Sequence, residues 1–175
     1  DGLKALEEWL TEGCISQIAE IYDGEIYDEK NSAEVFQKVK FEGQIPENIE
    51  ESTISVRIRE EMPIKSVTVR GDSTIIDFGQ NFTGTIRTDV VANAGDMVDI
   101  SFGEVLDADG NFYNANYRRA KCNYNYICKD GKQSYEPKFT FYGCRYIRVN
   151  QFPGGLDRVT PEAFTAVALY SQMAR

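Results

Sequence analysis

Apolar and polar residues alternate along the chain from about residue 66 almost to its end. Val98, Ile100 and Phe102 alternate with Asp99 and Ser101, which is the two-residue period of a strand with one buried face. β-Branched and aromatic residues dominate the runs of this kind, as is typical of pleated strands. The other runs are centred on Val67–Val69, Ile75–Phe78, Ile86–Val91, Tyr124–Tyr126, Phe139–Phe141, Tyr146–Val149 and Phe164–Tyr170.

Short polar segments separate these runs and contain the Gly, Asn and Asp residues that favour tight turns. Examples are Gly71-Asp72, Asn93-Ala-Gly-Asp96 and Lys129-Asp-Gly-Lys132. No long helical period interrupts the pattern. About eight strands joined by short turns predict an all-β fold, an antiparallel β-sandwich of the jelly-roll type.

The first third of the chain has a different composition. Residues 1–62 carry 16 acidic and 6 basic side chains and only 5 of the 21 aromatic residues, whereas residues 63–175 are nearly neutral. We therefore predict a boundary near Pro63, with an extended acidic arm or linker before it and the compact β-sandwich domain after it. Within the arm, Leu3, Leu6 and Leu10 with Trp9 could line one face of a short helix, but this apolar stripe covers barely two turns.

The charge of the chain limits its partners. The formal net charge is −9 and the pI is about 4.6, which argues against binding to nucleic acid or to an anionic membrane surface. No apolar run approaches the roughly 20 residues of a membrane span. The chain begins at Asp1 without a basic and apolar leader, so we expect a piece of a longer protein and favour a cytoplasmic location.

The absence of histidine removes several kinds of chemistry. Without imidazole the chain has no Ser-His-Asp or Cys-His machinery and no His-ligated zinc, and we expect no cofactor. The spacing of Cys14, Cys122, Cys128 and Cys144 fits neither a zinc ribbon nor a CxxC motif. We expect free thiols that pack as small apolar side chains. A disulfide between Cys122 and Cys128 is the alternative for an exported protein.

The segment Asp77-Phe-Gly-Gln-Asn-Phe-Thr-Gly84 stands out because two glycines bracket two amides. We predict that one strand ends here, that the backbone bends, and that a second strand starts at Thr85. Held on such a bend, the amides of Gln80 and Asn81 are candidates for hydrogen bonds to sugar hydroxyls. The alternative is that they satisfy backbone groups of the bend itself.

Asp107, Asp109 and Asn111 place oxygen ligands at every second residue, like the start of a calcium loop. An EF-hand would also need glycine at its sixth position and glutamate at its twelfth, where this sequence has Phe112 and Arg118. A plain hairpin turn is therefore favoured, and the three residues are weak metal candidates.

Three further side chains, Glu104, Arg118 and Tyr142, are candidates for contacts with a sugar. Glu104 follows a strongly apolar strand; the alternative is a carboxylate that binds an arginine such as Arg118. Tyr142 belongs to a tyrosine-rich region whose rings could stack on sugars, and the alternative is a place in the core. No spacing of acidic residues indicates a facing pair, so we predict no catalytic residue in this chain.

Several blocks, in their order and spacing, resemble the β-sandwich domain that precedes the catalytic domain in bacterial α-L-rhamnosidases. The blocks include Asp77 to Gly84, Phe102-Gly-Glu-Val-Leu-Asp-Ala-Asp-Gly-Asn-Phe-Tyr113 and Tyr135-Glu-Pro-Lys-Phe-Thr-Phe-Tyr-Gly143. The resemblance covers roughly residues 63–172. The segment Ile21-Tyr-Asp-Gly-Glu-Ile-Tyr-Asp28 resembles the end of the domain before it.

The resemblance implies that the acid and base carboxylates lie in an (α/α)6 barrel beyond this segment, so none can be assigned here. It implies a non-catalytic segment whose parent hydrolyses terminal α-L-rhamnosyl linkages. Its partners would be the catalytic and neighbouring β domains of the same polypeptide. One alternative is a carbohydrate-binding module that contacts rhamnose-containing glycans, and another is a domain that only spaces its neighbours.

Overall fold

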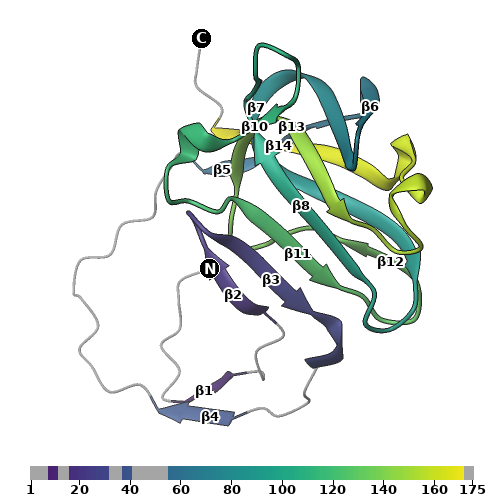
Figure 1. Cartoon of the computed structure of the whole chain (residues 1–175). Coiled ribbons are helices and arrows are strands. Elements are labelled where there is room, and N and C mark those ends of the chain that lie inside the picture. Colours follow the sequence, from purple (N-terminus) through teal and green to yellow (C-terminus); the bar gives the residue numbers. More distant parts are fainter. Residues whose placement is uncertain (1–7, 12–15, 32–36, 41–54, 172–175) are drawn as a thin grey trace.

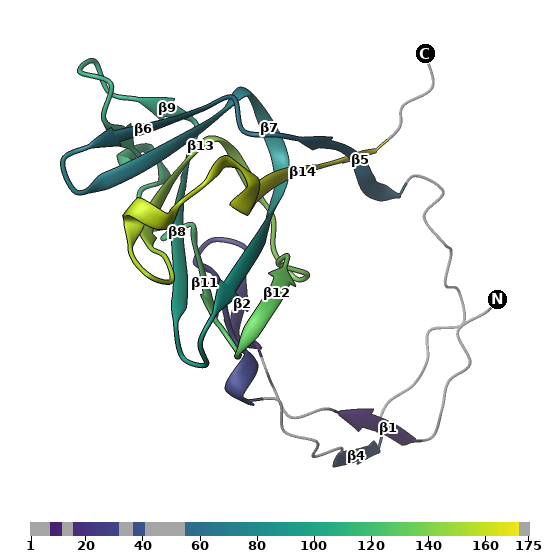
Figure 2. The ribbon, with the colours of Figure 1, turned by 90° about the vertical axis from the view of Figure 1, so that its right-hand side faces the viewer.

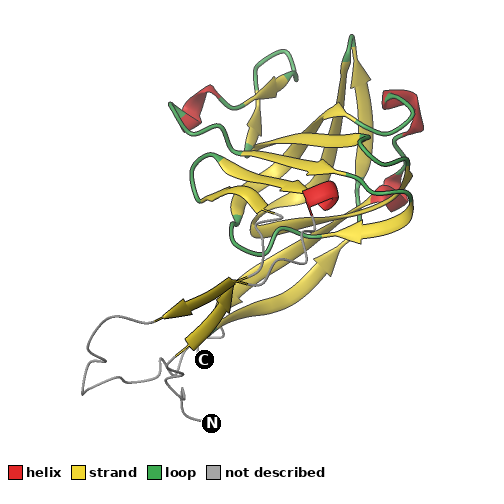
Figure 3. Ribbon diagram, turned by 90° about the horizontal axis from the view of Figure 1, so that it is seen from below, coloured by secondary structure: helices red, strands yellow, loops and turns green. Residues whose placement is uncertain are grey.

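The computed structural model describes residues 8–11, 16–31, 37–40 and 55–171, and strands make up most of them (Figures 1 and 3). The strands are β1 (Glu8–Thr11), β2 (Ser16–Glu20), β3 (Gly24–Asp28), β4 (Gln37–Lys40), β5 (Val56–Met62), β6 (Ser66–Arg70), β7 (Ser73–Ala92), β8 (Met97–Gly103), β9 (Val105–Leu106), β10 (Phe112–Tyr113), β11 (Asn123–Ile127), β12 (Gly131–Tyr135), β13 (Tyr142–Gln151) and β14 (Phe164–Ser171). The helical elements of this part are the short 3-10 turns η1 (Glu29–Asn31), η2 (Ala115–Tyr117), η3 (Leu156–Arg158) and η4 (Pro161–Ala163). No helix of the described chain is long and apolar enough to cross a membrane.

Ten strands form one curled sheet in the order β2-β3-β11-β8-β13-β7-β14-β5, with β6 and β12 also paired to β7. Residues 73–77 of β7 pair with β6, and residues 88–92 pair with β12. The long strand β7 therefore passes from one layer to the other, and the sheet folds over on itself (Figure 2). This confirms the predicted β-sandwich, with one parallel pair, β3 and β11, among antiparallel ones.

The core lies between the two layers. Val98, Ile100 and Phe102 of β8 are fully buried, as their alternation predicts, and each contributes about 2 kcal/mol by leaving water. From the other layer, Tyr135 of β12 stacks on Tyr126 of β11 with ring centroids 4.5 Å apart. Apolar and aromatic side chains from strands distant in sequence thus close the sandwich.

Two local predictions are wrong. Residues 139–141 are not a strand but part of the loop before β13, where Phe139 is 72% and Phe141 is 47% exposed. The segment that contains Trp9 and Leu10 is not a helix, because residues 8–11 form β1, which pairs with β4. Local apolar pattern alone cannot distinguish a packed element from an exposed one, because the partner surface decides the outcome.

Three of the described strands before Pro63 pair with the sandwich, whereas β1 and β4 pair with each other. β2 pairs with β3, β3 pairs with β11, and β5 pairs with β14. The division at residue 62 stays a prediction, but residues 16–28 and 56–62 belong to the same ten-stranded sheet as the rest.

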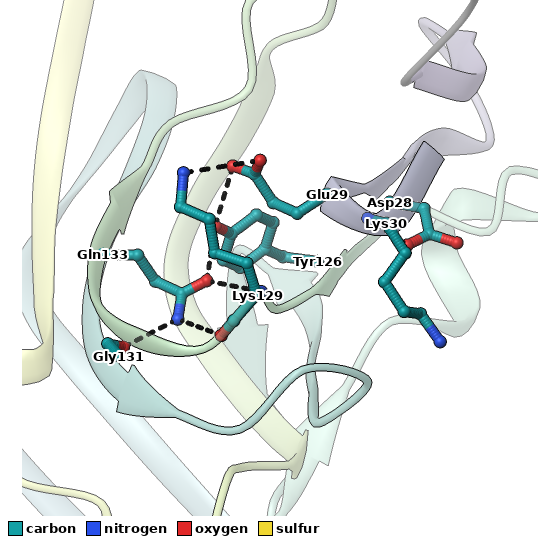
Figure 4. A network of polar contacts seen from close by, with 7 residues as sticks. All are labelled: Asp28, Glu29, Lys30, Tyr126, Lys129, Gly131 and Gln133. Carbon is teal, nitrogen blue, oxygen red and sulfur yellow. Dashed lines mark hydrogen bonds and ion pairs between the residues drawn. The ribbon is translucent and has the colours of Figure 1, made fainter. Parts of the chain in front are cut away.

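A network of polar contacts fixes η1 to the turn between β11 and β12 (Figure 4). The Tyr126 hydroxyl lies 3.1 Å from Glu29 Oε1 and 2.8 Å from Gln133 Oε1, so one hydrogen serves two acceptors. Lys129 Nζ lies 3.5 Å from Glu29 Oε2, and the Gln133 amide donates to the carbonyls of Lys129 and Gly131. Residues about 100 positions apart are thereby held together.

The cysteines of the described chain are free thiols, with Cys128 and Cys144 buried in the core and Cys122 half-buried. Burial raises the pKa of Cys128 to about 12 and raises the pKa of Cys122 and Cys144 as well. Cys14 lies outside the described residues.

We expect iodoacetamide to alkylate Cys122 well before Cys128 and Cys144 in the folded protein. At pH 8 a thiol with a pKa of about 12 is only about one part in 10⁴ thiolate, and thiolate is the reactive form. Mass spectrometry of tryptic peptides against reaction time measures the three rates. Equal rates in the native protein, or a Cys122–Cys128 disulfide in unreduced samples, would contradict this expectation.

Candidate functional site

Gln80 and Asn81, two of the polar residues singled out in the sequence, lie in a bulge of β7. Residues 82–84 pair with residues 142–144 of β13, and residues 74–77 pair with residues 146–149, so residues 78–81 face the single residue Arg145. The predicted strand break is therefore wrong: β7 runs through the segment, and only Gly79 takes a left-handed φ of +88°. The bulge turns the side chains of residues 78–81 without ending the strand.

An ion pair holds the base of this bulge. Arg145 Nε and Nη2 each lie 2.9 Å from an oxygen of Asp77, and the Gly79 amide donates to Asp77 Oδ1 at 2.6 Å. The Arg145 hydrogen bonds keep the pKa of Asp77 below its usual value. Asp77 thus remains an ionised structural carboxylate, and Arg145 also lies over the Tyr146 ring.

The structure brings two of the predicted sugar-binding residues together. The Asn81 amide donates to Glu104 Oε1 at 3.1 Å, so that the bulge of β7 is joined to the residue between β8 and β9. Gln80 points elsewhere, and its amide lies 2.9 Å from the Met62 sulfur. Asn81 is exposed and Glu104 is half-buried, so both are accessible to a ligand.

Tyr117 and Gly143 complete what we call the Asn81–Glu104 cluster. The Tyr117 hydroxyl donates to the Gly143 carbonyl at 2.9 Å, and a Cβ on Gly143 would lie 3.5 Å from Glu104 Oε1. Burial and the nearby charge of Glu104 raise the pKa of Tyr117. Sequence reasoning missed both residues, since Tyr117 was one tyrosine among many and its partner lies 26 positions away.

The other two predicted sugar contacts do not join this cluster. Tyr142 is only 3% exposed, stacks on Phe102 with centroids 3.6 Å apart, and donates its hydroxyl to the Asn123 carbonyl. Tyr142 is therefore a core residue, which was the alternative to a role in stacking on sugars. Arg118 is exposed with a left-handed φ of 59°, and its side chain has no hydrogen bond or ion pair to the described residues.

The loop of Asp107, Asp109 and Asn111 is a hydrogen-bonded turn. Asp107 Oδ1 accepts from the backbone amides of Asp109 and Asn111, and Oδ2 accepts from the Asn111 side chain. The bonds from Asn111 lower the pKa of Asp107. No group of three or more acidic or cysteine side chains in the part of the chain that the structure describes is arranged to hold a metal ion.

Among the described carboxyl groups whose pKa is shifted, Asp77, Asp107 and Glu61 lie below their usual values and Glu25 lies above. Asp77 and Glu61 each bind an arginine, which lowers the pKa of both and keeps them ionised. Glu25 has the raised pKa that a general acid needs, because burial disfavours its charge. However, Glu25 is 2% exposed and lies inside the sandwich, so a substrate cannot reach it.

The fold defines a β-sandwich domain that carries an exposed polar cluster. A family model for the bacterial alpha-L-rhamnosidase concanavalin-like domain matches residues 67–170, and the chain belongs to this family. The resemblance in the residue blocks is thereby confirmed.

Relatives and solved structures agree with this assignment. An α-L-rhamnosidase of Streptomyces avermitilis is 35% identical over 150 residues, which cover 78% of this chain and 15% of that protein. An α-L-rhamnosidase of Formosa agariphila is 34% identical over 155 residues, and the match covers 81% of this chain and 17% of that protein. The chain therefore spans less than a fifth of these curated relatives.

Among solved structures, the Streptomyces avermitilis enzyme complexed with L-rhamnose superposes with a TM-score of 0.76 at 32% identity. The match covers 87% of this chain and 16% of that one. The α-L-rhamnosidase of Aspergillus terreus gives a TM-score of 0.77 at 28% identity and covers 92% of this chain and 20% of its own. In each case the similar region is a small part of a larger enzyme.

Proposed function

We propose that this chain is a non-catalytic β-sandwich segment of an α-L-rhamnosidase-like glycoside hydrolase that hydrolyses terminal α-L-rhamnosyl linkages. The observation that carries the proposal is the match to the concanavalin-like domain over residues 67–170. The similar proteins are named α-L-rhamnosidases, and this chain corresponds to 15% and 17% of two of them. Most of such a protein, with room for its catalytic carboxylates, lies outside this segment.

Exposed apolar side chains support a role in contacting other domains of the same polypeptide. Figure 2 shows β5 and the end of β14 extending away from the two layers. Val56, Ile58 and Tyr170 on these strands are each at least half exposed. Val56 and Ile58 share one face of this pair of strands, whereas Tyr170 pairs with Arg57 and lies on the other face. The face of Val56 and Ile58 favours burial against a neighbouring surface.

The first test is catalytic. We expect the purified chain to release no p-nitrophenol from p-nitrophenyl α-L-rhamnopyranoside above the buffer rate, because the one described carboxyl group with a raised pKa, Glu25, is buried out of reach of a substrate. Release that Glu104→Gln abolishes would contradict the proposal and place catalysis in the Asn81–Glu104 cluster.

The second test concerns docking within the complete enzyme. We expect Ile58→Asp to lower its Tm and to reduce rhamnoside hydrolysis several-fold, because a charge on β5 would have to be buried in the domain contact. Val69→Asp is the matched control, since Val69 is equally apolar, is 70% exposed and lies on β6. Equal Tm values and rates for the two variants would refute a docking role for β5.

A further inference from the structure

A cleft of about 760 Å³ lies at the end of β7, away from the Asn81–Glu104 cluster. Its walls come from the last residues of β7, from β12, and from the segment that carries η3 and η4. The volume falls within the range of about 300–1,000 Å³ that is usual for small-molecule sites. The cleft is thus large enough for a ligand and is made by three separate parts of the chain.

The cleft combines an apolar floor with a polar rim. Phe152, Pro153 and Ala163 line it and are buried members of the domain. Lys132 and Arg158 reach it as exposed side chains. Apolar surface beneath converging polar groups is the usual composition of a binding site for an amphiphilic small molecule.

Three charged side chains of the rim are free to bind a ligand. The side chains of Lys132, Arg158 and Glu162 form no hydrogen bond or ion pair within the residues that the structure places. The other two acidic side chains of the cleft already have partners: Asp89 lies 4.0 Å from Arg87 Nε, and Asp96 accepts from the Asn93 backbone amide. The rim therefore offers unused donors and acceptors side by side.

The balance of charges indicates the class of ligand. Asp89, Asp96 and Glu162 face the cleft together with Lys132 and Arg158, so acidic and basic groups nearly cancel. A phosphate or sulfate would meet the carboxylates, and a cation would meet the lysine and arginine. Vicinal hydroxyl groups can accept from the cations and donate to the carboxylates at the same time. The C–H face of a sugar ring suits the apolar floor.

We propose that this cleft binds a neutral saccharide and so gives the segment a sugar-binding surface of its own, beyond its role as a non-catalytic part of a larger enzyme. Lys132 and Arg158 donate to ring hydroxyls, Glu162 accepts from them, and the ring lies over Phe152 and Pro153. Such contacts hold a polysaccharide near the enzyme without taking part in bond cleavage.

The test is an NMR titration of the isotope-labelled chain with L-rhamnose and with the rhamnose-containing disaccharide rutinose. We expect saturable amide shifts confined to Val91, Lys132, Gly154 and their neighbours. Arg158→Ala should weaken binding about tenfold, as expected for one hydrogen bond to a charged group. Arg57→Ala, an exposed arginine on β5 outside the cleft, should leave the affinity unchanged.

The outcomes separate this proposal from the proposed function. No saturable shifts up to tens of millimolar sugar, or shifts confined to the Asn81–Glu104 cluster, would overturn the cleft as a saccharide site. Either result would leave the non-catalytic role untouched, because that role is judged by hydrolysis of the chromogenic rhamnoside. Equal affinities of the wild type and Arg158→Ala, with shifts at the cleft, would overturn the assigned role of Arg158.

Discussion

Gly84→Ala should unfold the sandwich at a much lower temperature than the wild type. A Cβ on Gly84 would lie 2.0 Å from the Val167 carbonyl oxygen and 2.9 Å from its carbon, well inside van der Waals contact. Gly84 pairs with both Tyr142 of β13 and Ala168 of β14, so the backbone has no free side toward which to move. We expect a loss of about 3 kcal/mol or more, equivalent to a Tm lower by about 10 °C.

Gly143→Ala is the matched control for this substitution. Gly143 is next to Tyr142 on β13, has no left-handed φ, and a Cβ there would meet only Glu104 Oε1 at an ordinary 3.5 Å. We expect a change within about 0.5 kcal/mol, as for surface substitutions in general. Thermal unfolding followed by circular dichroism compares the two variants, and equal Tm values would refute the close approach of β7 and β14 at Gly84.

The two glycines of the same motif show where sequence reasoning succeeds and where it fails. Gly79 takes the left-handed conformation that a glycine in a bend predicts, because backbone conformation is a local property. Gly84 is needed for a different reason, the approach of β14 from more than 80 positions away. The local sequence pattern holds no information about a contact with so distant a strand. The glycines were therefore interpreted as a strand break, where the structure has a continuous strand.

The strands of the sandwich were predictable for a similar reason. In β8 the apolar residues Val98, Ile100 and Phe102 alternate with polar ones, and all three of these apolar side chains are fully buried, as the two-residue period of a strand predicts. By contrast, composition did not predict that strands of the acidic N-terminal segment pair with the sandwich. Its strand β3 pairs in parallel with β11, and Glu25 and Glu29 reach tyrosines about 100 positions away.

The candidate site was predictable only in part. Asn81 and Glu104 were each suspected from their local setting, and the structure joins them by a hydrogen bond across 23 positions. Tyr142 was suspected as a stacking platform, but its ring is used in the core against Phe102. Which side of a strand a tyrosine faces depends on register, and one residue of shift reverses it.

Glu25→Gln should change how stability depends on pH. Glu25 is buried between the layers, Oε1 accepts from the Tyr135 hydroxyl, and Oε2 has no hydrogen bond of good geometry to the described residues, although the Lys138 backbone lies nearby. Burial raises the pKa of Glu25 above 4.5, and the Tyr135 and Lys138 contacts offset this only in part. A buried carboxyl group of this kind is more stable protonated than charged.

The direction of the effect follows from proton linkage. Because the folded state binds the Glu25 proton more tightly than the unfolded state, its stabilising contribution is complete below pH 4.5 and is lost as pH rises through the folded pKa. One proton changes the free energy of unfolding by at most about 1.4 kcal/mol per pH unit. The lowered pKa of Asp77 gives a stabilising contribution whose pH dependence has the opposite sign, because it is lost as the pH falls. The contributions of Asp77 and Glu25 to the pH dependence of stability therefore fall in different pH ranges.

Urea unfolding at a series of pH values between about 5 and 8 measures this contribution. We expect the free energy of unfolding of the wild type to decline with pH relative to Glu25→Gln, which carries no titrating group at that position. Glu60→Gln, an exposed carboxylate on β5, should behave like the wild type. Tyr135→Phe removes the hydrogen bond that lowers the pKa of Glu25. The free energy of unfolding of this variant should therefore go on declining to higher pH than that of the wild type. Parallel profiles for the wild type, Glu25→Gln and Tyr135→Phe would contradict a raised pKa of Glu25 in the folded protein.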